Sequence, residues 1–207
     1  ASITRHDLRN QLTAIREYLE LSLARREKDP KTAWVDVDSA ATVVNQTINT
    51  VEFTGEYQKI GVKSPVWKKA KDLVDESGKD TNLGSIRLEN AIPASVEVYA
   101  DPLVQKVFFN LIDNAVRYGK KTTTIRFRFE ESEEGSTLIC EDDGIGIAPD
   151  EKEKIFVFEY GMNTGLGLFL VREILTITGI TIRETGIPGK GARFEMKCPK
   201  GAIRIKP

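Results

Sequence analysis

A chain of 207 residues with 40% hydrophobic and 29% charged residues has the balance of a globular protein with one large domain or two small ones. Its 30 basic and 31 acidic residues give a net charge of −1, which argues against nucleic acid as the main partner. No stretch approaches the roughly 20 apolar residues of a membrane span. The chain begins without methionine, almost at once in a helical pattern. We therefore expect a cytoplasmic piece of a longer protein, whose upstream sensor domain or membrane anchor would precede Ala1.

Two amphipathic helices are predicted in the first third of the chain. Apolar residues recur there at spacings of three and four in a first stripe, formed by Leu8, Leu12, Ile15, Leu19 and Leu23. A second stripe follows Pro30 and comprises Val37, Ala41, Val44, Ile48 and Val51. Because the connection is short, the helices should pack antiparallel as a hairpin. We expect a homodimer in which two hairpins form a four-helix bundle; the alternative is a hairpin that packs on the rest of its own chain.

A change of pattern follows this hairpin. Gly61 and Pro65 mark a hinge, so we place the boundary after residue 62, with a helical domain over 1–62 and a second domain over 63–207. Helices are predicted there over 65–77, 102–118 and 164–178. Strands are predicted over 85–88, 96–99, 123–129, 136–140, 181–184 and 193–197. Cys140 and Cys198 lie in apolar strand runs and fit buried free thiols better than a disulfide.

The helix over 102–118 carries a polar strip beside its apolar face. Asp101-Pro102 is a typical helix start, with an N-cap acceptor followed by proline. Asn110, Asn114 and Arg117 stand at i, i+4 and i+7 and therefore share one side of the helix. Two amides and a guanidinium on one strip can coordinate a metal and bind phosphate oxygens. Taken alone, such a strip is more often a solvated face.

Two glycine motifs follow the helix. The first, Glu141-Asp142-Asp143-Gly144-Ile145-Gly146, has the pattern D-x-G-x-G after a strand, where Asp142 can accept a hydrogen bond from an exocyclic amine. The second, Asn163-Thr164-Gly165-Leu166-Gly167-Leu168, opens a helix whose unpaired N–H groups favour phosphate. Neither the G-x-x-x-x-G-K-[ST] loop nor the G-x-G-x-x-G fingerprint of two common nucleotide folds is present.

In this order the three motifs resemble those of the ATP-binding superfamily shared by histidine kinases, type II topoisomerases, a heat-shock chaperone and a mismatch-repair protein. The residues from Asn110 to Tyr118 look like the kinase N box, and Asp142 to Gly146 and Gly165 to Leu168 look like the two glycine boxes. The resemblance spans about Asp101 to Arg172. It implies an α+β protein in which the helical hairpin precedes an α/β sandwich ATP-binding domain with a mixed sheet.

The resemblance also implies the cofactors, ATP and Mg²⁺, and a role for each matching residue. Asn114 would bind Mg²⁺, and Asn110 and Arg117 would face the phosphates. Tyr118 would stack on adenine, and Asp142 would accept a hydrogen bond from its amino group. The glycine boxes would hold the nucleotide through Gly144, Gly146, Thr164, Gly165, Leu166 and Gly167.

The single histidine, His6, lies in Thr4-Arg5-His6-Asp7-Leu8-Arg9-Asn10. On a helical wheel His6 and Asn10 share an outward face, about 140° from the apolar stripe for His6. Alone, this is an ordinary surface histidine. The segment resembles the H box of histidine kinases, which implies that His6 accepts the γ-phosphoryl of ATP and passes it to an aspartate of a response regulator receiver domain. Asp7 would hold the imidazole proton, and Asn10 would orient water if the protein also dephosphorylates the regulator.

Two departures from the family pattern stand out. Gln11 occupies a position where many members have proline, so a kink in the first helix needs another cause. The segment between Gly146 and Gly165 is short, apolar and without a basic residue after Lys154, and we expect it to pack against the hairpin instead of forming a long lid. Two other readings stay open: a nucleotide-binding dimeric scaffold without catalysis, and a serine kinase of the anti-sigma type, which would lack the histidine-bearing hairpin.

Overall fold

The computed structural model describes the backbone of residues 5–132, 135–158, 160 and 165–206. This part of the chain forms two compact units, and the division falls between Gln58 and Lys59, a few residues before the boundary expected after residue 62. None of the described helices is long and apolar enough to cross a bilayer.

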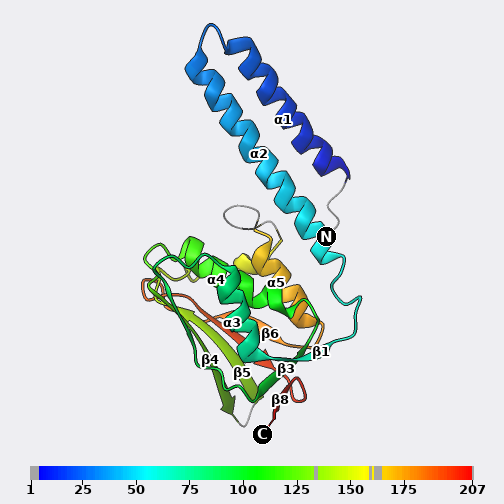
Figure 1. Ribbon diagram of the computed structural model, residues 1–207, viewed down its shortest axis with the longest axis vertical. Helices are drawn as coiled ribbons and strands as arrows, with labels where there is room; N and C mark the ends of the chain where they lie inside the picture. Colours follow the sequence, from blue (N-terminus) through cyan, green and yellow to red (C-terminus); the bar gives the residue numbers. More distant parts are fainter. Residues whose placement is uncertain (1–4, 133–134, 159, 161–164, 207) are drawn as a thin grey trace. The chain divides into compact units, whose positions relative to one another are not determined.

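The first unit consists of two helices, α1 (Arg5–Arg25) and α2 (Pro30–Tyr57), joined by a short connection (Figure 1). Ser22 Oγ donates a hydrogen bond to the carbonyl of Ala33, at 2.9 Å. Arg25 Nη1 lies 3.2 and 3.0 Å from the two carboxylate oxygens of Asp36. Since residues 22–25 of α1 face residues 33–36 of α2, the two helices run antiparallel.

The start of α2 is fixed by its own sequence. The Asp29 carboxylate accepts a hydrogen bond from the Thr32 N–H at 3.2 Å, as an N-cap does, and Pro30 occupies the first turn, where its missing N–H costs nothing. The hydrogen bond to Thr32 lowers the pKa of Asp29. Asp29 and Pro30 therefore fix the residue at which the connection between α1 and α2 ends and α2 begins.

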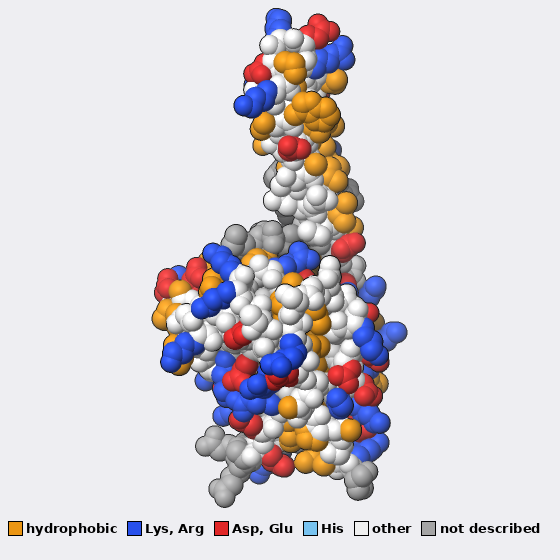
Figure 2. All heavy atoms as spheres, turned by 60° about the vertical axis from the view of Figure 1, so that its left-hand side comes forward, with side chains coloured by type: hydrophobic (Ala, Val, Ile, Leu, Met, Phe, Trp, Pro, Cys, Tyr) orange, Lys and Arg blue, Asp and Glu red, His pale blue; other side chains and the backbone are white. Residues whose placement is uncertain are grey.

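The large apolar residues of this unit are mostly on its surface. Leu12 is 60% exposed, and the other exposed members of the two predicted stripes are Leu19, Leu23, Val44, Ile48 and Val51. The apolar residues of this unit that are buried are Ala33, Ala40 and Phe53, all of which lie on α2. Figure 2 shows hydrophobic side chains gathered along these helices. Packing of α1 on α2 alone therefore leaves these members of the two stripes uncovered.

The second unit contains two β-sheets and a layer of helices. Its helices are α3 (Ala70–Asp80), α4 (Val104–Tyr118), α5 (Gly167–Thr176) and a short 3₁₀ turn (Lys154–Phe156). Its strands are β1 (Val66–Lys69), β2 (Arg87–Asn90), β3 (Val96–Ala100), β4 (Thr124–Ser132), β5 (Gly135–Asp142), β6 (Thr181–Glu184), β7 (Arg193–Cys198) and β8 (Ile203–Ile205). The larger sheet has the order β2-β4-β5-β7-β6 and is mixed, because β2 pairs with β4 in parallel and the other pairs are antiparallel. The smaller sheet has the order β1-β3-β8 and is antiparallel.

The core lies between the helices and the larger sheet, with α4 between α3 and α5 (Figure 1). Phe108 of α4 contacts Phe127 of β4, with ring centroids 5.8 Å apart, and both side chains are at most 1% exposed. The strands alternate as expected for a sheet with one face on a core: Phe194 and Met196 of β7 are buried, whereas Arg193 and Glu195 point the other way. The α+β class and the mixed sheet predicted from the sequence are confirmed.

One predicted helix is partly a strand. The helix expected over 65–77 is replaced by β1, which pairs with β3, and by α3, which begins only at Ala70. Trp67 of β1 packs against Tyr99 of β3, with ring centroids 5.1 Å apart, and under the guanidinium of Arg204. These partners lie more than thirty residues away in sequence, so a local pattern could not reveal them. The strand β8, which completes this sheet, was likewise not predicted.

Asp101 does not cap α4 as predicted. The helix begins at Val104, and Asp101 lies before it with 1% exposure. Its two carboxylate oxygens accept hydrogen bonds from the N–H groups of Leu103 and Gly61, each at 2.8 Å. The carboxylate thus fixes the turn before α4 and ties Gly61 to the second unit.

Both cysteines are free and buried, as predicted. Burial raises the pKa of the Cys198 thiol to about 12 and that of Cys140 well above its usual range. Both thiols are therefore unreactive at neutral pH.

Candidate functional site

The polar strip of α4 borders the helix's buried face. The apolar side of the helix is in the core and consists of Val104, Val107, Phe108, Leu111, Ile112 and Ala115. This burial fixes the rotation of α4, which places Asn110, Asn114 and Arg117 along the adjoining side. Asn110 Nδ2 donates to the carbonyl of Lys106 at 2.8 Å, so its side chain is oriented by its own helix.

Asn114 carries a buried polar atom with no partner. Its Nδ2 is out of contact with solvent and has no hydrogen-bond acceptor within the described structure. Because a buried unpaired donor costs free energy, its presence in a folded core indicates a position that a ligand satisfies. The amide can also turn its oxygen toward a cation.

Arg117 is held by a neighbour on its own helix. Its Nε lies 2.7–2.8 Å from the carboxylate oxygens of Asp113, one turn earlier, and 60% of its side chain is exposed. The hydrogen bond to Asp113 raises the pKa of Arg117. The guanidinium is therefore charged and close to the strip, but it makes its described contact with Asp113 and would have to turn to reach a phosphate. Tyr118, the last residue of α4, is half-buried next to it.

Asp142 is the last residue of β5. The strand is held on both sides, since Asp142 faces Ile125 of β4 and its N–H donates to the Ala192 carbonyl before β7, at 3.0 Å. Its Oδ1 accepts hydrogen bonds from the N–H groups of Gly144 (2.8 Å) and Ala192 (3.3 Å). Both described hydrogen bonds go to the same oxygen, and Oδ2 remains for a ligand.

Burial raises the pKa of the Asp142 carboxyl above its ordinary value, although the two N–H groups act in the opposite direction. A partly buried carboxylate with one oxygen unpaired is a suitable acceptor for an amine of a base.

The glycines of the first box allow three segments to meet at this carboxylate. A Cβ added at Gly144 would lie 2.7 Å from Asp142 Oδ1 and 2.8 Å from the Cα of Gly119. Gly146 has a φ of +69°, and a Cβ there would lie 2.8 Å from the carbonyl oxygen of Gly191. Larger residues at 144 or 146 would push the box away from α4 and from the turn before β7.

The second glycine box contacts the polar strip directly. A Cβ at Gly167, the first residue of α5, would lie 2.8 Å from Asn110 Oδ1. Gly165 has a φ of +60°, and Leu166 is 5% exposed and anchors the loop in the core. The helix starts at Gly167 and not at 164 as predicted, and Thr164 lies outside the described residues. Because Gly167 has no side chain, the N-terminus of α5 can lie directly against the N box.

The glycine-rich turn between β6 and β7, whose place at the site was not predicted from the sequence, forms a third wall. Residues 185–192, between β6 and β7, supply Ala192 to Asp142, and the Gly189 N–H donates to the Ile145 carbonyl at 2.7 Å. Glu184 holds this turn through Oε1, which accepts from the N–H groups of Gly186 (2.9 Å) and Arg193 (3.0 Å). The glycine-rich composition of the turn was visible in the sequence, but only the pairing of β5 with β7 places it here.

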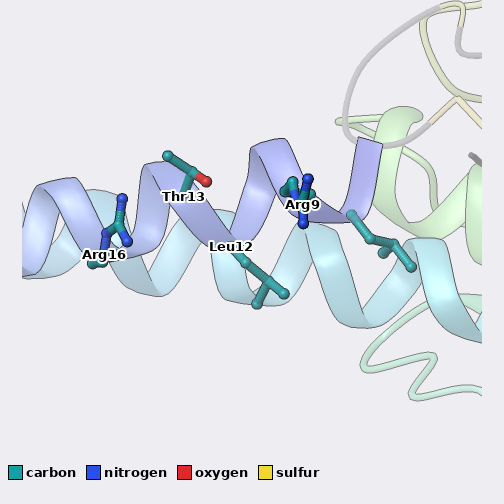
Figure 3. Close-up of a pocket in the computed structure, with 5 residues that line it drawn as sticks. Arg9, Leu12, Thr13 and Arg16 are labelled. Carbon is teal, nitrogen blue, oxygen red and sulfur yellow. The ribbon is translucent and has the colours of Figure 1, made fainter. Parts of the chain in front are cut away.

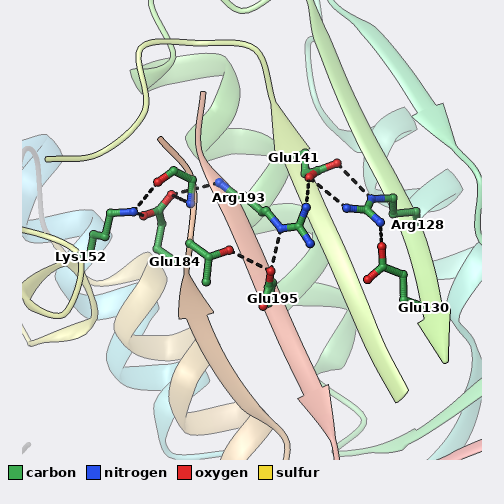
Figure 4. Close-up of polar contacts among 9 residues, drawn as sticks. Arg128, Glu130, Glu141, Lys152, Glu184, Arg193 and Glu195 are labelled. Atoms are coloured by element: carbon green, nitrogen blue, oxygen red, sulfur yellow. Dashed lines mark hydrogen bonds and ion pairs between the residues drawn. The ribbon is translucent and has the colours of Figure 1, made fainter. Parts of the chain in front are cut away.

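Lys152 completes the anchoring of this turn (Figure 4). Its Nζ donates to the Gly186 carbonyl at 2.5 Å and lies 2.7 Å from Oε2 of the buried Glu184. Oε2 has no hydrogen bond of acceptable geometry, so its contact with Lys152 is an ion pair. Lys152 follows the first glycine box, and it thereby ties the segment after the box to the turn.

The same sheet carries a network of charges on its other face. Figure 4 shows Arg193 between Glu141 and Glu195, and Arg128 between Glu141 and Glu130. A cavity of about 690 Å³ is lined by these strands and by the turn, including Asp142. These ion pairs link β4, β5 and β7 and so brace the strand that ends in Asp142.

The apolar segment after the first glycine box is buried within the second unit. Phe156 is 1% exposed, meets Phe194 of β7 edge-on at 6.2 Å and lies under the guanidinium of Arg172. Phe158 meets Phe169 of α5 at 5.4 Å. These contacts hold Phe156 and Phe158 against elements of the second unit.

His6, Asp7 and Asn10 lie on α1. The side chains of His6 and Asp7 are outside the described part of the structure. Asn10 is exposed. A surface hollow of about 410 Å³ follows the same helix and is lined by Leu8, Arg9, Leu12, Thr13 and Arg16, four of which are labelled in Figure 3.

These residues fit ATP and Mg²⁺. The glycine cradle leaves backbone exposed where side chains would collide, and the Asn114 amide nitrogen is a buried polar atom without a hydrogen-bond partner among the described residues. No group of three or more His, Cys, Asp or Glu converges among the described residues. Mg²⁺ would therefore be held by amide oxygen, phosphate and water, a ligand set that this ion accepts.

The model of the family "Histidine kinase-, DNA gyrase B-, and HSP90-like ATPase" matches residues 100–202. Sensor protein SrrB of Staphylococcus aureus (strain MRSA252) is 34% identical over 128 residues, which are 58% of this chain and 22% of SrrB. SrrB of strain NCTC 8325 is 36% identical over 106 residues, which are 47% of this chain and 18% of that protein. The chain thus spans about a fifth of the length of the curated relatives it matches.

Solved structures share the fold at lower identity. Acinetobacter baumannii histidine kinase AdeS matches over 94% of this chain and 98% of that one, with a TM-score of 0.64 and 21% identity. The match to the mycobacterial sensor histidine kinase MprB covers 69% of this chain and 99% of the MprB chain, with a TM-score of 0.60 and 20% identity. The match to full-length ShkA in complex with AMPPNP covers 92% of this chain and 45% of the ShkA chain, with a TM-score of 0.62 and 18% identity.

The family match includes the N box and both glycine boxes, and in the structure Gly144 of the first box approaches Gly119 after α4 while Gly167 of the second box approaches Asn110. Residues 100–202 therefore belong to the histidine kinase-, DNA gyrase B- and HSP90-like ATPase family, a domain that this chain shares with the sensor protein SrrB.

Proposed function

We propose that this chain is an ATP-dependent protein-histidine kinase that transfers the γ-phosphoryl group of ATP to His6. The observation that carries the proposal is that one chain combines a domain of the ATP-binding family, which includes Asn114 and Asp142, and a helix that bears its only histidine. A serine kinase of the anti-sigma type would not need that helix, and a purely structural nucleotide site would not need the histidine.

The ATP-binding domain contributes position and electrostatics. Asp142 accepts a hydrogen bond from the base amine, and Asn114 holds Mg²⁺ through its amide oxygen. The N–H groups at the start of α5 face the phosphates, where the helix dipole favours negative charge. ATP with Mg²⁺ supplies the phosphoryl group, ADP as leaving group and charge neutralisation. Arg117 is the nearest cation on the strip and reaches the phosphates when it leaves Asp113.

On α1, His6 is the nucleophile. A neutral imidazole attacks the γ-phosphorus through one ring nitrogen, the bond from that phosphorus to the bridging oxygen breaks, and ADP leaves. Asp7 accepts the proton of the other ring nitrogen, which offsets the positive charge that develops on the ring. An unperturbed imidazole is mostly neutral at pH 7, so the reaction needs no unusual pKa.

Labelling with γ-labelled ATP tests this function. Wild type should acquire an acid-labile, base-stable label, and His6→Ala should abolish the label while nucleotide binding persists. Asn114→Ala should abolish the label by removing Mg²⁺. A label that survives His6→Ala, or one stable to acid, would refute the assignment; binding without any label would favour the non-catalytic scaffold.

A second test concerns Asp142. Asp142→Asn keeps an oxygen for Gly144 and Ala192 but places an amide NH₂ where the base amine donates. We expect at least about tenfold weaker ATP binding. Because burial raises the pKa of Asp142, its ionised form costs stability at neutral pH, and the nucleotide-free variant should unfold at an equal or higher temperature. Loss of stability together with binding would mean that the residue is structural.

The exposed stripes of the hairpin support a homodimer. Leu12, Leu19, Val44 and Ile48 are large apolar residues on both helices, and a second hairpin would bury them in a four-helix bundle. The bundle leaves His6 and Asn10 on its exterior, as the wheel predicts.

The next acceptor is an aspartate of a response regulator receiver domain. Arg9 and Arg16, two exposed basic side chains of α1, give such a domain a place to contact. Asn10, which is exposed one turn after His6, would orient water in the reverse, dephosphorylating reaction. Asn10→Ala should leave labelling of His6 unchanged and slow dephosphorylation of the regulator; equal rates would remove that role.

A further inference from the structure

Asp101 is a buried carboxylate that the proposed chemistry does not use. It directly follows β3, and 1% of its surface is exposed. Its two oxygens accept hydrogen bonds from the N–H groups of Leu103 and Gly61, each at 2.8 Å. A carboxylate is costly to bury, because water no longer solvates its charge. The bond to Leu103 serves the turn before α4, but the bond to Gly61 reaches a distant part of the sequence and needs another explanation.

Gly61 belongs to the segment 59–62, which follows α2 and is part of the second unit. Its φ is +71°, a backbone conformation that glycine adopts without strain. A Cβ added there would lie 3.1 Å from Cδ1 of Ile177, the residue directly after α5. One glycine therefore meets the start of α4 through Asp101 and the end of α5 through Ile177.

The same two helices carry the proposed phosphate end of the nucleotide site. Asn110 and Asn114 lie on later turns of α4, and a Cβ added at Gly167, the first residue of α5, would lie 2.8 Å from Asn110 Oδ1. The helices α4 and α5 are thus packed antiparallel, with Gly61 at one end of the pair and the second glycine box towards the other. Because closely packed helices are hard to deform, the segment 59–62 and the phosphate end of the site are held on one rigid element.

The bond to Asp101 also sets where the chain is first held by the domain. Without it, the next residue held by the sheet is Val66, the first residue of β1, which pairs with Ala100. Between them Val62 is 73% exposed. The attachment point of the chain that comes from α2 would therefore move from Gly61 to Val66. A longer free tether lowers the effective concentration of one tethered group at another.

We propose that Asp101 is a positioning residue for phosphoryl transfer. This inference rests on the proposed function, in which ATP held by the domain phosphorylates His6. Asp101 clamps the segment 59–62 to the helices that carry the nucleotide, and it thereby shortens the tether between the nucleotide and the histidine. The described partners of its side chain are Leu103 and Gly61, so it acts on the rate of transfer and not on the affinity for ATP.

The first test compares Asp101→Asn with wild type. Asparagine keeps an oxygen for the Leu103 N–H but places an NH₂ group against the Gly61 N–H, so the clamp is lost and the turn before α4 is kept. At saturating γ-labelled ATP, labelling of His6 should be about tenfold slower. The affinity for ATP should stay within about twofold of wild type. Asp75→Asn, which makes the same change on α3 of the same domain, is the matched control and should label at the wild-type rate.

A second variant loosens the clamp from the side of the linker. Gly61→Ala strains a φ of +71° and places a Cβ against Ile177, while residues 100–202 keep their sequence. It should slow labelling at saturating ATP by a similar factor, again with unchanged ATP affinity. If both variants break one clamp, the double variant should label no more than about twofold slower than the slower single variant, and not about a hundredfold slower than wild type.

Hydrogen exchange measures the clamp without reference to activity. Exchange of the backbone amides in the segment 59–62 should be faster in Asp101→Asn and in Gly61→Ala than in wild type, and unchanged in Asp75→Asn. A role of Asp101 confined to the turn before α4 would leave this segment unaffected.

Four results would overturn the proposal: a wild-type labelling rate in Asp101→Asn or in Gly61→Ala, a loss of ATP affinity as large as the loss of rate, rate losses that multiply in the double variant, or unchanged exchange over 59–62. Wild type that acquires no label on His6 would overturn the proposed function and this inference with it. Labelled wild type with indifferent variants overturns this inference alone.

Discussion

The ATP-binding domain and the hairpin use apolar residues in different ways. In the domain, Phe108, Phe127 and Ile112 are at most 1% exposed and lie between helices and sheet. In the hairpin, Leu12 and Leu23 are about 60% exposed, and burial between the helices falls mainly on alanines. The domain is therefore complete as one chain, whereas the hairpin needs a second surface. The proposed nucleotide site lies in the domain, and the proposed acceptor, His6, lies on the hairpin.

This contrast predicts that a core truncation affects only the domain. Phe127→Ala should lower its free energy of unfolding by about 3–5 kcal/mol, because a fully buried ring is replaced by a cavity. Trp67 lies in the domain and Trp34 in the hairpin, so urea unfolding followed by fluorescence in a Trp34→Phe background reports on the domain. Phe127→Leu, which keeps most of the volume, should cost clearly less. A shift of the hairpin's helical signal by the same amount would contradict the independence of the two units.

A charge introduced into the apolar stripe of the hairpin should weaken dimerisation. Leu19→Glu removes apolar burial from both copies, about 3 kcal/mol per dimer, and should weaken dimerisation roughly hundredfold. Sedimentation equilibrium measures this. Gln46→Glu adds the same charge at an exposed polar position of α2 and serves as control. ATP binding should be unchanged in both variants. A dimer that tolerates Leu19→Glu would place the interface elsewhere.

The smallest effect concerns Asp143, which follows β5 in the first glycine box. Desolvation acts to raise its pKa, but the hydrogen bonds from Thr123 and Thr124 outweigh it and bring the pKa of Asp143 down to about 2. A lowered pKa means that the ionised carboxylate stabilises the fold above its unfolded pKa of about 3.9 and loses this contribution as the pH falls through 2.

Asp143→Asn should therefore be less stable than wild type by about 1 kcal/mol at pH 7, a modest value because the carboxylate is close to solvent. The difference should shrink as the pH falls from 4 to 2. Thermal unfolding at several pH values gives the comparison. A difference that does not depend on pH would show that the carboxylate charge is not the cause.

The sequence was informative where chemistry is local. The strip of Asn110 and Asn114 follows from the period of one helix, and the glycine boxes follow from short motifs. The stripes of the hairpin follow in the same way. The features that the sequence did not predict depend on contacts between distant residues. Strand β1 forms by pairing with β3, which in turn pairs with β8. The turn at 185–192 reaches Asp142 only because β7 pairs with β5. Asp101 resembled an N-cap in sequence, yet Gly61, forty residues earlier, is among its partners.

Gly61 illustrates the same limit. No motif includes it, and in the sequence it marks only a hinge. It gains significance because its N–H donates to Asp101 and its Cα lies close to Ile177. Sequence reasoning identified the residues that carry family motifs and missed those that geometry alone recruits.

The central claim is that the nucleotide held by the ATP-binding domain phosphorylates the histidine of the hairpin. The most direct measurement is to map the phosphoryl group by fragmentation mass spectrometry under mildly alkaline conditions, after incubation of wild type and Asn114→Ala with ATP and Mg²⁺. The account predicts a phosphoryl group on His6 in wild type and none in Asn114→Ala. A phosphoryl group on another residue, or on His6 in both proteins, would contradict it.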